Sequence, residues 1–515
     1  MVKIDILVIG TGLAGAIAAI TAADNGCKVI VITKTENVIS GSTAHAQGGI
    51  IYKGLKDSPE KLKKDIIQAG AGNCWEPAVD QLCQKGSNLV EKLLIERFKV
   101  DFDRNEYNEL ELTSEGAHSE RRIIHSKDKT GETIQTSVTK ELQNHPNIRV
   151  LTNHSAFDLL TLSHHSTNLN DIYEKPACFG ALVLDNLSGT IFPIYANETI
   201  LATGGLGQIY QHTTNPKETT GDGIALAWRA GARCFNLQYV QFHPTTLYTE
   251  RSERFLISEA MRGEGAELID QNGMQFMNKY HKLGSLAPRD IVARGIHQTM
   301  LDNGHPCVYL NISHKNSIWI KDRFPTIYEH CIASGIDITS EPIPVVPAEH
   351  YFCGGIGVNL RGRTSLQRLY AVGEVACTGV HGANRLASTS LLENVVWAYY
   401  AGLDASKHCR SDSYFPEIYP WIDATEDADP ALIAQDWTTI KNTMWNYVGL
   451  IRTRGRLLRA RTILRHLQTE IEQFYLKAKM TRDVIELRNS VQTAIAVASA
   501  TYEARVSCGT HFLID

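Results

Sequence analysis

The chain opens with IDILVIGTGLAG at residues 4–15. Residues 4–9 form a short apolar run rich in β-branched side chains, which predicts a buried parallel strand. The run leads into a G-x-G-x-x-G pattern at Gly10, Gly12 and Gly15, followed by a helix-forming stretch and a second apolar run at residues 29–32. A βαβ unit of about 30 residues with this glycine spacing is typical of a dinucleotide-binding fold.

Each glycine of the pattern has its own physical role. Gly10 makes the tight turn after the strand, Gly12 lets a pyrophosphate approach the backbone, and Gly15 lets the helix pack on the strand. The N-terminus of the helix then directs free N–H groups and the positive end of its dipole at the phosphates. Glycine turns are common, so the pattern by itself leaves an ordinary turn open, but its place between two strands favours a bound dinucleotide.

The acid that usually holds the adenosine ribose is absent. It is expected roughly 20 residues after the glycines, but Thr33 and Lys34 stand near that place and Glu36 comes slightly late. The sequence therefore predicts that the ribose is held in a different way, which disfavours a plain NAD site.

Composition excludes several classes of protein. A chain of 515 residues with 43% hydrophobic and 21% charged residues is long enough for two to four soluble globular domains. The net charge of -5 argues against nucleic-acid binding, and no apolar run approaches the ~20 residues of a membrane span. The eleven cysteines are scattered without a C-x-x-C pair, and no signal peptide is evident. We therefore expect a cytoplasmic protein with reduced thiols and no metal site.

Further glycine-rich segments predict that the bound nucleotide is large. Residues 40–49, SGSTAHAQGG, suggest a loop lying against a cofactor, although an ordinary surface turn is the alternative. The predicted buried strand 198–202 ends in Thr203-Gly204-Gly205, and a second glycine-rich strand end in the same sheet is what FAD would need. The strand 369–372 ends at Glu374, whose carboxylate is well placed to accept hydroxyls of the ribitol chain. Ser390, near the start of the next helix, would direct N–H groups at the flavin.

Two other segments leave their interpretation open. The polar residues 113–125 taken alone are more typical of a solvated loop than of a site. Arg289 follows Pro288 at the start of a predicted helix, where the helix dipole is unfavourable for a cation. That cost suggests a use facing a cleft, while an exposed arginine is an equally good explanation. The arginine-rich run 452–465, in a mainly helical C-terminal region, predicts a solvated face.

Several segments together make the chain similar to the succinate dehydrogenase/fumarate reductase flavoproteins over its whole length. The shared motifs are GTGLAG (10–15), AQGG (46–49), LATGG (201–205), QFHPT (241–245), APRDIVAR (287–294), HYFCGG (350–355), AVGEVA (371–376) and HGANRLASTSLLE (381–393). The resemblance implies an α/β fold with a Rossmann-like FAD-binding domain (residues 1–236 and 350–405), an inserted α+β capping domain (237–349) and a C-terminal helical domain (406–515).

The resemblance also implies how FAD is held. The respiratory members bind FAD covalently through a histidine five residues before the AQGG glutamine, where this chain has Ser42, and His45 is out of place. The FAD is therefore expected to be noncovalent. The residues expected to bind it are Gly10, Thr11, Gly12, Leu13, Ala14, Gly15, Lys34, Ser42, Thr43, Ala44, His45, Ala46, Gln47, Gly48, Gly49, Ala156, Thr203, Gly204, Asp222, Glu374, Ser388, Ser390 and Leu391.

One segment is typical of the branch of the family that oxidises aspartate. The stretch SEGAHSERRIIHSKDKTG, residues 114–131, resembles the signature that places a carboxylate, here Glu115, near the substrate. Arg289 matches the residue that donates a proton to fumarate in the reductases; because arginine is a poor base, it would act on aspartate mainly as a charge clamp. The expected substrate-binding residues are Glu115, Gln241, His243, Ser258, His350 and Arg385.

The implied reaction converts L-aspartate to iminoaspartate, and oxygen or fumarate then takes up the electrons. The product would go on through quinolinate synthase to quinolinate and NAD, so a functional coupling to that enzyme is expected. A soluble fumarate reductase uses most of the same residues and is the main alternative. A noncatalytic flavoprotein or an electron-transfer subunit is disfavoured because Arg289, His350 and Arg385 are all present.

Overall fold

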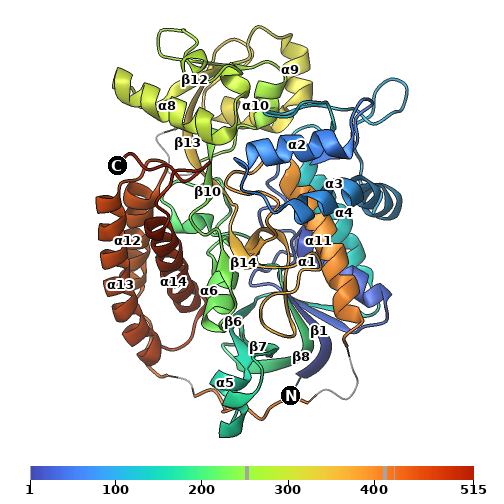
Figure 1. The fold of residues 1–515 in the computed structure, drawn as a ribbon, viewed down its shortest axis with the longest axis vertical. Coiled ribbons are helices and arrows are strands. Elements are labelled where there is room, and N and C mark those ends of the chain that lie inside the picture. The colour runs from blue at the N-terminus through green and yellow to red at the C-terminus, as the bar shows by residue number, and fades with distance from the viewer. Residues whose placement is uncertain (1, 250–253, 410–413, 423) are drawn as a thin grey trace.

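The protein is described here from a computed structural model that places residues 2–249, 254–409, 414–422 and 424–515. Figure 1 shows a twisted sheet flanked by helices in the lower right part, a lobe of strands and helices at the top, and a bundle of C-terminal helices on the left. The predicted fold class, a Rossmann-like FAD-binding fold with an inserted lobe and a helical C-terminal region, is confirmed.

The largest sheet has seven strands in the order β5-β2-β1-β8-β7-β6, with β15 also paired to β8. β1, β2, β5, β8 and β15 pair in parallel, whereas β6, β7 and β8 pair antiparallel. Its strands are β1 (Val2–Ile9), β2 (Val29–Ile32), β5 (Ile148–Leu151), β6 (His154–Thr161), β7 (Cys178–Asp185), β8 (Ile191–Leu201) and β15 (Leu369–Ala371).

Both faces of this sheet are buried at residues 6–9 of β1, which explains why this half of the strand is a continuous apolar run. Ile6 and Val8 point to one face and pack in a core with α1, α3, α4 and α11. Leu7 and Ile9 point to the other face, toward α6 and the C-terminal helices. The helices of the first face are α1 (Leu13–Asp24), α2 (Pro59–Ala69), α3 (Glu76–Leu89) with its π-helical continuation η1 (Val90–Arg97), α4 (Thr130–Asn144) and α11 (Thr389–Ser406).

β8 is longer than the buried strand predicted at residues 198–202. It is one strand of eleven residues, Ile191–Leu201. Its first half pairs antiparallel with β7, its second half pairs in parallel with β15, and β1 runs along the other side. Different neighbours along the two halves therefore give one continuous strand two sequence patterns.

The upper lobe is built on a four-stranded antiparallel sheet in the order β10-β13-β12-β11. β10 and β13, the first and last strands, are neighbours, so the chain enters and leaves the lobe at one place. The predicted domain boundary between residues 349 and 350 falls inside β13. The elements are β10 (Val240–Leu247), α7 (Glu259–Gly263), β11 (Glu267–Ile269), η4 (Met277–Lys279), η5 (Gly284–Leu286), α8 (Arg289–Asn303), β12 (Val308–Asn311), α9 (Ser317–Arg323), α10 (Pro325–Ala333) and β13 (Ile343–Phe352).

Three long helices form the C-terminal bundle, α12 (Pro430–Val448), α13 (Arg454–Lys477) and α14 (Arg482–Glu503). The prediction of a solvated basic face is wrong for Arg452, which is fully buried and donates to the backbone oxygens of Gln238 and Gly449. The remaining short elements are β3 (Ile50–Ile51), β4 (Ile123–Ile124), α5 (Leu162–His165), η2 (Leu169–Tyr173), η3 (Gly207–Ile209), α6 (Asp222–Arg229), β9 (Cys234–Phe235), β14 (Gly355–Gly357), η6 (Gly373–Val375) and β16 (Ala376–Cys377).

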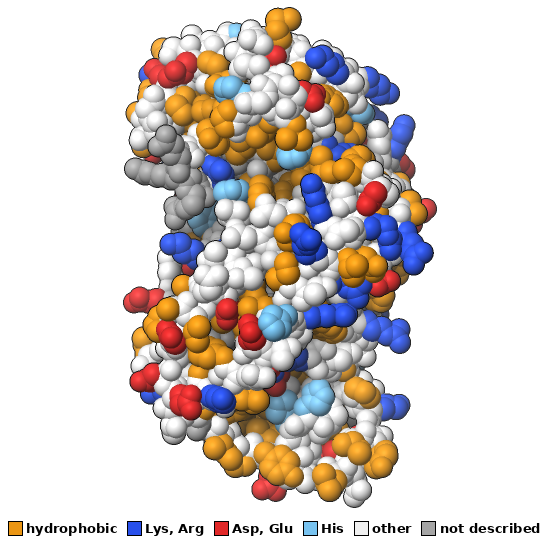
Figure 2. All heavy atoms as spheres, turned by 90° about the vertical axis from the view of Figure 1, so that its left-hand side faces the viewer, with side chains coloured by type: hydrophobic (Ala, Val, Ile, Leu, Met, Phe, Trp, Pro, Cys, Tyr) orange, Lys and Arg blue, Asp and Glu red, His pale blue; other side chains and the backbone are white. Residues whose placement is uncertain are grey.

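On the face shown in Figure 2, basic side chains are interspersed with acidic and uncharged ones. Within the described parts of the chain, no helix is long and apolar enough to cross a membrane.

Candidate active site

One cavity brings together segments from all parts of the chain. It is lined by the start of α1, residues 40–49, the ends of β2 and β8, the upper lobe and the start of α11. Of the predicted site residues, Gly15, Ala44 and Gln241 lie outside its lining, and all the others line it. The sequence prediction therefore outlines a continuous space, whose two ends differ in chemistry.

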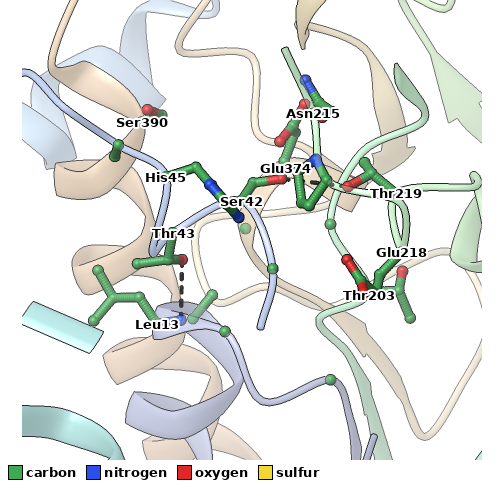
Figure 3. Close-up of a pocket in the computed structure, with 18 of the residues that line it drawn as sticks. Leu13, Ser42, Thr43, His45, Thr203, Asn215, Glu218, Thr219, Glu374 and Ser390 are labelled. Carbon is green, nitrogen blue, oxygen red and sulfur yellow. Dashed lines mark hydrogen bonds between the residues drawn. The ribbon is translucent and has the colours of Figure 1, made fainter. Parts of the chain in front are cut away.

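The start of α1 has the geometry that a pyrophosphate requires. Gly10 has a φ of +115°, and a Cβ there would collide with the backbone oxygen of Ala202. A Cβ on Gly15 would collide with the backbone of Gly10, so this glycine serves helix–strand packing. Thr43 accepts a hydrogen bond from the N–H of Leu13 at 3.3 Å, which ties residues 40–49 to the helix start (Figure 3).

The polar groups of the cavity fit FAD. Gln47 Oε1, Thr203 Oγ1 and Asn394 Oδ1 are buried in its lining without a hydrogen-bond partner among the described residues, so a polar ligand can satisfy them. Glu374 lines the same cavity as Ser42 and Asn215 (Figure 3) and accepts from the N–H of Phe352 at 3.0 Å. Burial raises the pKa of Glu374 to about 7, which suits a carboxyl group that exchanges hydrogen bonds with sugar hydroxyls.

Segment 113–125 is not a solvated loop, which is a correction to the interpretation from its polarity alone. Glu115 is 5% exposed and accepts a hydrogen bond from Ser388 Oγ at 2.6 Å. Arg122 is fully buried and forms ion pairs with Asp57 at 2.8 Å and Asp65 at 2.6 Å. Glu115 and Arg122 therefore have their polar partners inside the protein, and these contacts hold Glu115 at the cavity.

Two buried guanidinium groups face this end of the cavity and differ in their partners. Arg289, the first residue of α8, forms a close ion pair with Glu259, which offsets its unfavourable place in the helix dipole. Arg385 donates to Ser390 Oγ at 2.6 Å and lies 4.1 Å above the ring of Tyr351. No described carboxylate is within ion-pair distance of Arg385, and burial together with Arg289 lowers its pKa to about 10.

Gln241 lies behind the two arginines. Its side-chain oxygen accepts from Arg289 Nη1 at 3.0 Å and from Arg385 Nε at 3.4 Å. Its amide nitrogen donates to Asn384 Oδ1 at 2.7 Å and to the backbone oxygen of Arg385 at 2.8 Å. The geometry therefore gives Gln241 a positioning role, although substrate contact is what the family resemblance implies.

His243 and His350 lie side by side, with ring centroids 5.0 Å apart. Burial and then the positive charge of Arg289 lower the pKa of each well below its ordinary value, so both are neutral. His243 Nδ1 is 3.0 Å from the carbonyl oxygen of Thr245 and 3.2 Å from the backbone N–H of the same residue, and these contacts hold the ring in place. His350 Nδ1 is 2.8 Å from the hydroxyl of Thr214.

Glu259 and two residues of α14 are among the lining residues that were not predicted from the sequence. Glu259 and Ser258 are adjacent at the start of α7, but only Ser258 was expected; Glu259 bridges Arg289 and Arg262. Arg289 and Arg262 outweigh burial and keep the pKa of Glu259 low. Ile485 and Glu486, at the far end of the cavity, come from α14, more than 450 residues after the dinucleotide pattern. No local signal marks these residues, because their partners are distant in the sequence.

Comparisons with known proteins agree with this geometry. Residues 5–391 match the family model described as FAD binding domain. L-Aspartate oxidase 1 of Ralstonia nicotianae is 42% identical over 99% of this chain and 95% of its own length, and L-aspartate oxidase of Pseudomonas aeruginosa is 42% identical with the same coverage. Among solved structures, Escherichia coli quinol fumarate reductase superposes with a TM-score of 0.88 at 26% identity, covering 100% of this chain and 91% of that chain.

Fold, cofactor and relatives lead to one assignment. The cavity fits FAD, the family model is that of an FAD-binding domain, and the relatives match along nearly the whole chain. The chain belongs to the L-aspartate oxidase family of FAD-dependent oxidoreductases, within the succinate dehydrogenase/fumarate reductase flavoproteins.

Proposed function

We propose that the protein oxidises L-aspartate to iminoaspartate. The observation that carries this proposal is the juxtaposition of two buried cations, Arg289 and Arg385, with the buried carboxylate Glu115 in one cavity. A molecule with two carboxylates and one ammonium complements this set of charges. The relatives with the name L-aspartate oxidase support the same substrate.

The residues divide the binding between them. Arg385 has no carboxylate partner of its own, so a substrate carboxylate completes its bidentate pairing. A second carboxylate near His243 and His350 would bring the negative charge that allows these neutral rings to take up a proton. Burial and then Glu259 raise the pKa of Glu115, which suits a group that pairs with a substrate ammonium and can receive its proton.

The chemistry removes a hydride from Cα and a proton from nitrogen. FAD, when bound, supplies the hydride acceptor at N5 of its flavin ring. Arg289 is already paired with Glu259 and Gln241, so it contributes positive charge at a fixed position rather than acting as a base. Exclusion of water follows from burial, since Glu115, Arg289 and Arg385 are each less than one-tenth exposed.

Two acceptors are proposed for the electrons: oxygen, giving hydrogen peroxide, or fumarate, giving succinate. The buried series Arg262–Glu259–Arg289 supports fumarate as the acceptor. Reduction of fumarate to succinate needs a proton, and this series places exchangeable protons at the cavity. A fumarate reductase or succinate dehydrogenase is accordingly the second candidate function, and the solved fumarate reductase structure supports it.

Anaerobic mixing separates the two functions. The FAD-loaded protein is mixed with L-aspartate or with succinate, and the loss of yellow absorbance is followed. Rapid bleaching by aspartate and little by succinate is expected; bleaching by succinate alone would replace the proposal with the second candidate. Adding fumarate or oxygen to the bleached protein then shows which acceptor restores the colour faster.

Ser42 supports noncovalent FAD. Its hydroxyl is 3.5 Å from Thr219 Oγ1, and a serine cannot form the linkage that a histidine makes in respiratory relatives. Acid precipitation should leave all the colour in the supernatant, and a yellow pellet would contradict this.

We also propose that iminoaspartate feeds the synthesis of NAD through quinolinate synthase. An imine hydrolyses readily, so a nearby consumer of the product would conserve it. The test measures quinolinate formation from aspartate by the two proteins at equal activity. The rate with both proteins in one vessel is compared with the rate when a membrane permeable only to small molecules separates them.

A further inference from the structure

The adenosine end of the cavity contains a buried cation where the sequence pattern usually has an acid. Lys34 follows β2, and its ammonium lies 2.7 Å from Asp222 Oδ2 and 2.8 Å from Glu486 Oε1. Burial alone would lower the pKa of Lys34, but the two carboxylates outweigh it and the pKa is raised. Lys34 therefore stays charged, and it holds two carboxylates at the position where the usual pattern has its acid.

Glu486 belongs to α14, and that helix is fixed at the cavity by contacts with loop 219–222. Asn489 donates to Asp222 Oδ1 at 2.9 Å, Ser490 to the backbone oxygen of Thr220 at 2.9 Å, and Thr493 to that of Gly221 at 3.0 Å. Ile485 and Glu486 both line the cavity. The C-terminal bundle thus contributes part of the cavity wall.

The two carboxylates differ in what they leave for a ligand. Asp222 is engaged at both oxygens, since Thr220 donates to Oδ2 at 3.0 Å in addition to Lys34, and Asn489 donates to Oδ1. Glu486 is held at one oxygen only: Lys34 and Arg482 both donate to Oε1, the latter at 2.8 Å. No described residue donates to Glu486 Oε2. An oxygen of an anchored carboxylate is therefore available at the wall of the cavity.

We propose that Glu486 replaces the missing acid and accepts hydrogen bonds from the hydroxyls of the adenosine ribose of FAD. Lys34 sets the position of the Glu486 carboxylate through their ion pair. It follows the end of β2, next to which the ribose lies in this fold, whereas Glu486 comes from α14. The C-terminal helix α14 thereby completes the cofactor site. The proposal concerns FAD alone and does not depend on which substrate is oxidised.

The test measures dissociation constants of the apoprotein by titration calorimetry. The ligands are FAD, an FAD analogue whose adenosine ribose lacks its 2′ and 3′ hydroxyls, and FMN, which has no adenosine. Wild type should bind FAD about 10- to 150-fold more tightly than the analogue, the usual value of a charge-assisted hydrogen bond. In Glu486→Gln this ratio should fall toward one, while the affinity for FMN stays unchanged.

The matched control is Glu472→Gln on α13. Glu472 pairs with Arg488 of α14 at 3.0 Å but does not line the cavity, so this change removes a carboxylate from the same helix pair without touching the ligand. It should keep the wild-type ratio. If apo Glu486→Gln does not refold, Glu486→Asp, which withdraws the carboxylate by one methylene, is measured with the same expectation.

Two results would overturn the proposal. Equal affinity of wild type for FAD and the analogue would show that no group reads the ribose hydroxyls. A Glu486 variant that weakens both ligands equally and keeps their ratio would show that Glu486 only supports the packing of α14.

Discussion

At the scale of single residues, Glu115 carries the distinction between aspartate and succinate. These two ligands share two carboxylates and differ by one amino group, so a group that pairs with nitrogen must separate them. Glu115 is buried, held by Ser388 at 2.6 Å, and in the same cavity as Arg289 and Arg385. A charge-assisted hydrogen bond contributes ~1.5–3 kcal/mol, or roughly 10- to 150-fold in affinity.

Glu115→Gln keeps the size and the hydrogen bond from Ser388 but removes the charge. Aspartate should bind about 10- to 150-fold more weakly, whereas succinate, which has no ammonium, should bind equally well or slightly better. Ligand dissociation constants from flavin absorbance changes, measured for wild type and variant, check this. Equal losses for both ligands would mean that Glu115 supports the site without reading the amine.

At the scale of elements, segment 113–125 is held in place by one buried charge network. Arg122 joins this segment to Asp57 and Asp65 near α2, and Asp65 also accepts from Ser119. Removing one partner of a buried ion pair leaves an uncompensated charge, which typically costs about 3–5 kcal/mol. The position of Glu115 therefore depends on an arginine that does not touch the cavity.

Arg122→Met should lower the free energy of unfolding by about 3–5 kcal/mol. Arg121→Met is the matched control, because Arg121 is the next residue and its side chain is 58% exposed. Exposed substitutions usually change stability by less than about 0.5 kcal/mol. Urea denaturation of the two variants measures the difference, and similar losses in both would show that the network is not what stabilises the segment.

At the scale of the whole molecule, the free energy of unfolding depends on pH through buried groups whose shifted pKa values have opposite effects. Burial raises the pKa of Glu349 to about 8, while His118 and His511 have pKa values lowered to about 4. For Glu349 the native state keeps a proton that the unfolded state releases above its ordinary pKa of about 4.3. The contribution of Glu349 to the free energy of unfolding therefore falls as the pH rises from about 4.3 to 8. The histidines act in the opposite direction below about pH 6.5.

Comparison of wild type with Glu349→Gln isolates the carboxyl group. The amide stays neutral at every pH, so the variant should gain stability relative to wild type between pH 5 and pH 8, by at most about 1.4 kcal/mol per pH unit. Urea denaturation of the apoproteins across this range measures the change. Glu329→Gln, at an exposed glutamate, should run parallel to wild type. A constant offset between Glu349→Gln and wild type would show that Glu349 is ionised throughout.

The sequence by itself determined the features that depend on neighbouring residues. The strand–glycine–helix opening could be predicted because a turn at φ +115° and close helix packing require glycine at fixed spacings. The fold class and FAD followed from such local patterns together with the family motifs. Arg289 could be placed at a helix start because proline and acid positions near it are local signals too.

Only the tertiary structure decided which polar groups are buried and what they contact. The burial of segment 113–125 depends on Asp57 and Asp65, the anchoring of Arg289 on Glu259, and the adenosine end of the cavity on Glu486 in α14. β8 likewise takes its length from three different neighbours. The physical reason is the same in each case: a buried charge is stable only beside its partner, and partners distant in the chain leave no trace in the local pattern.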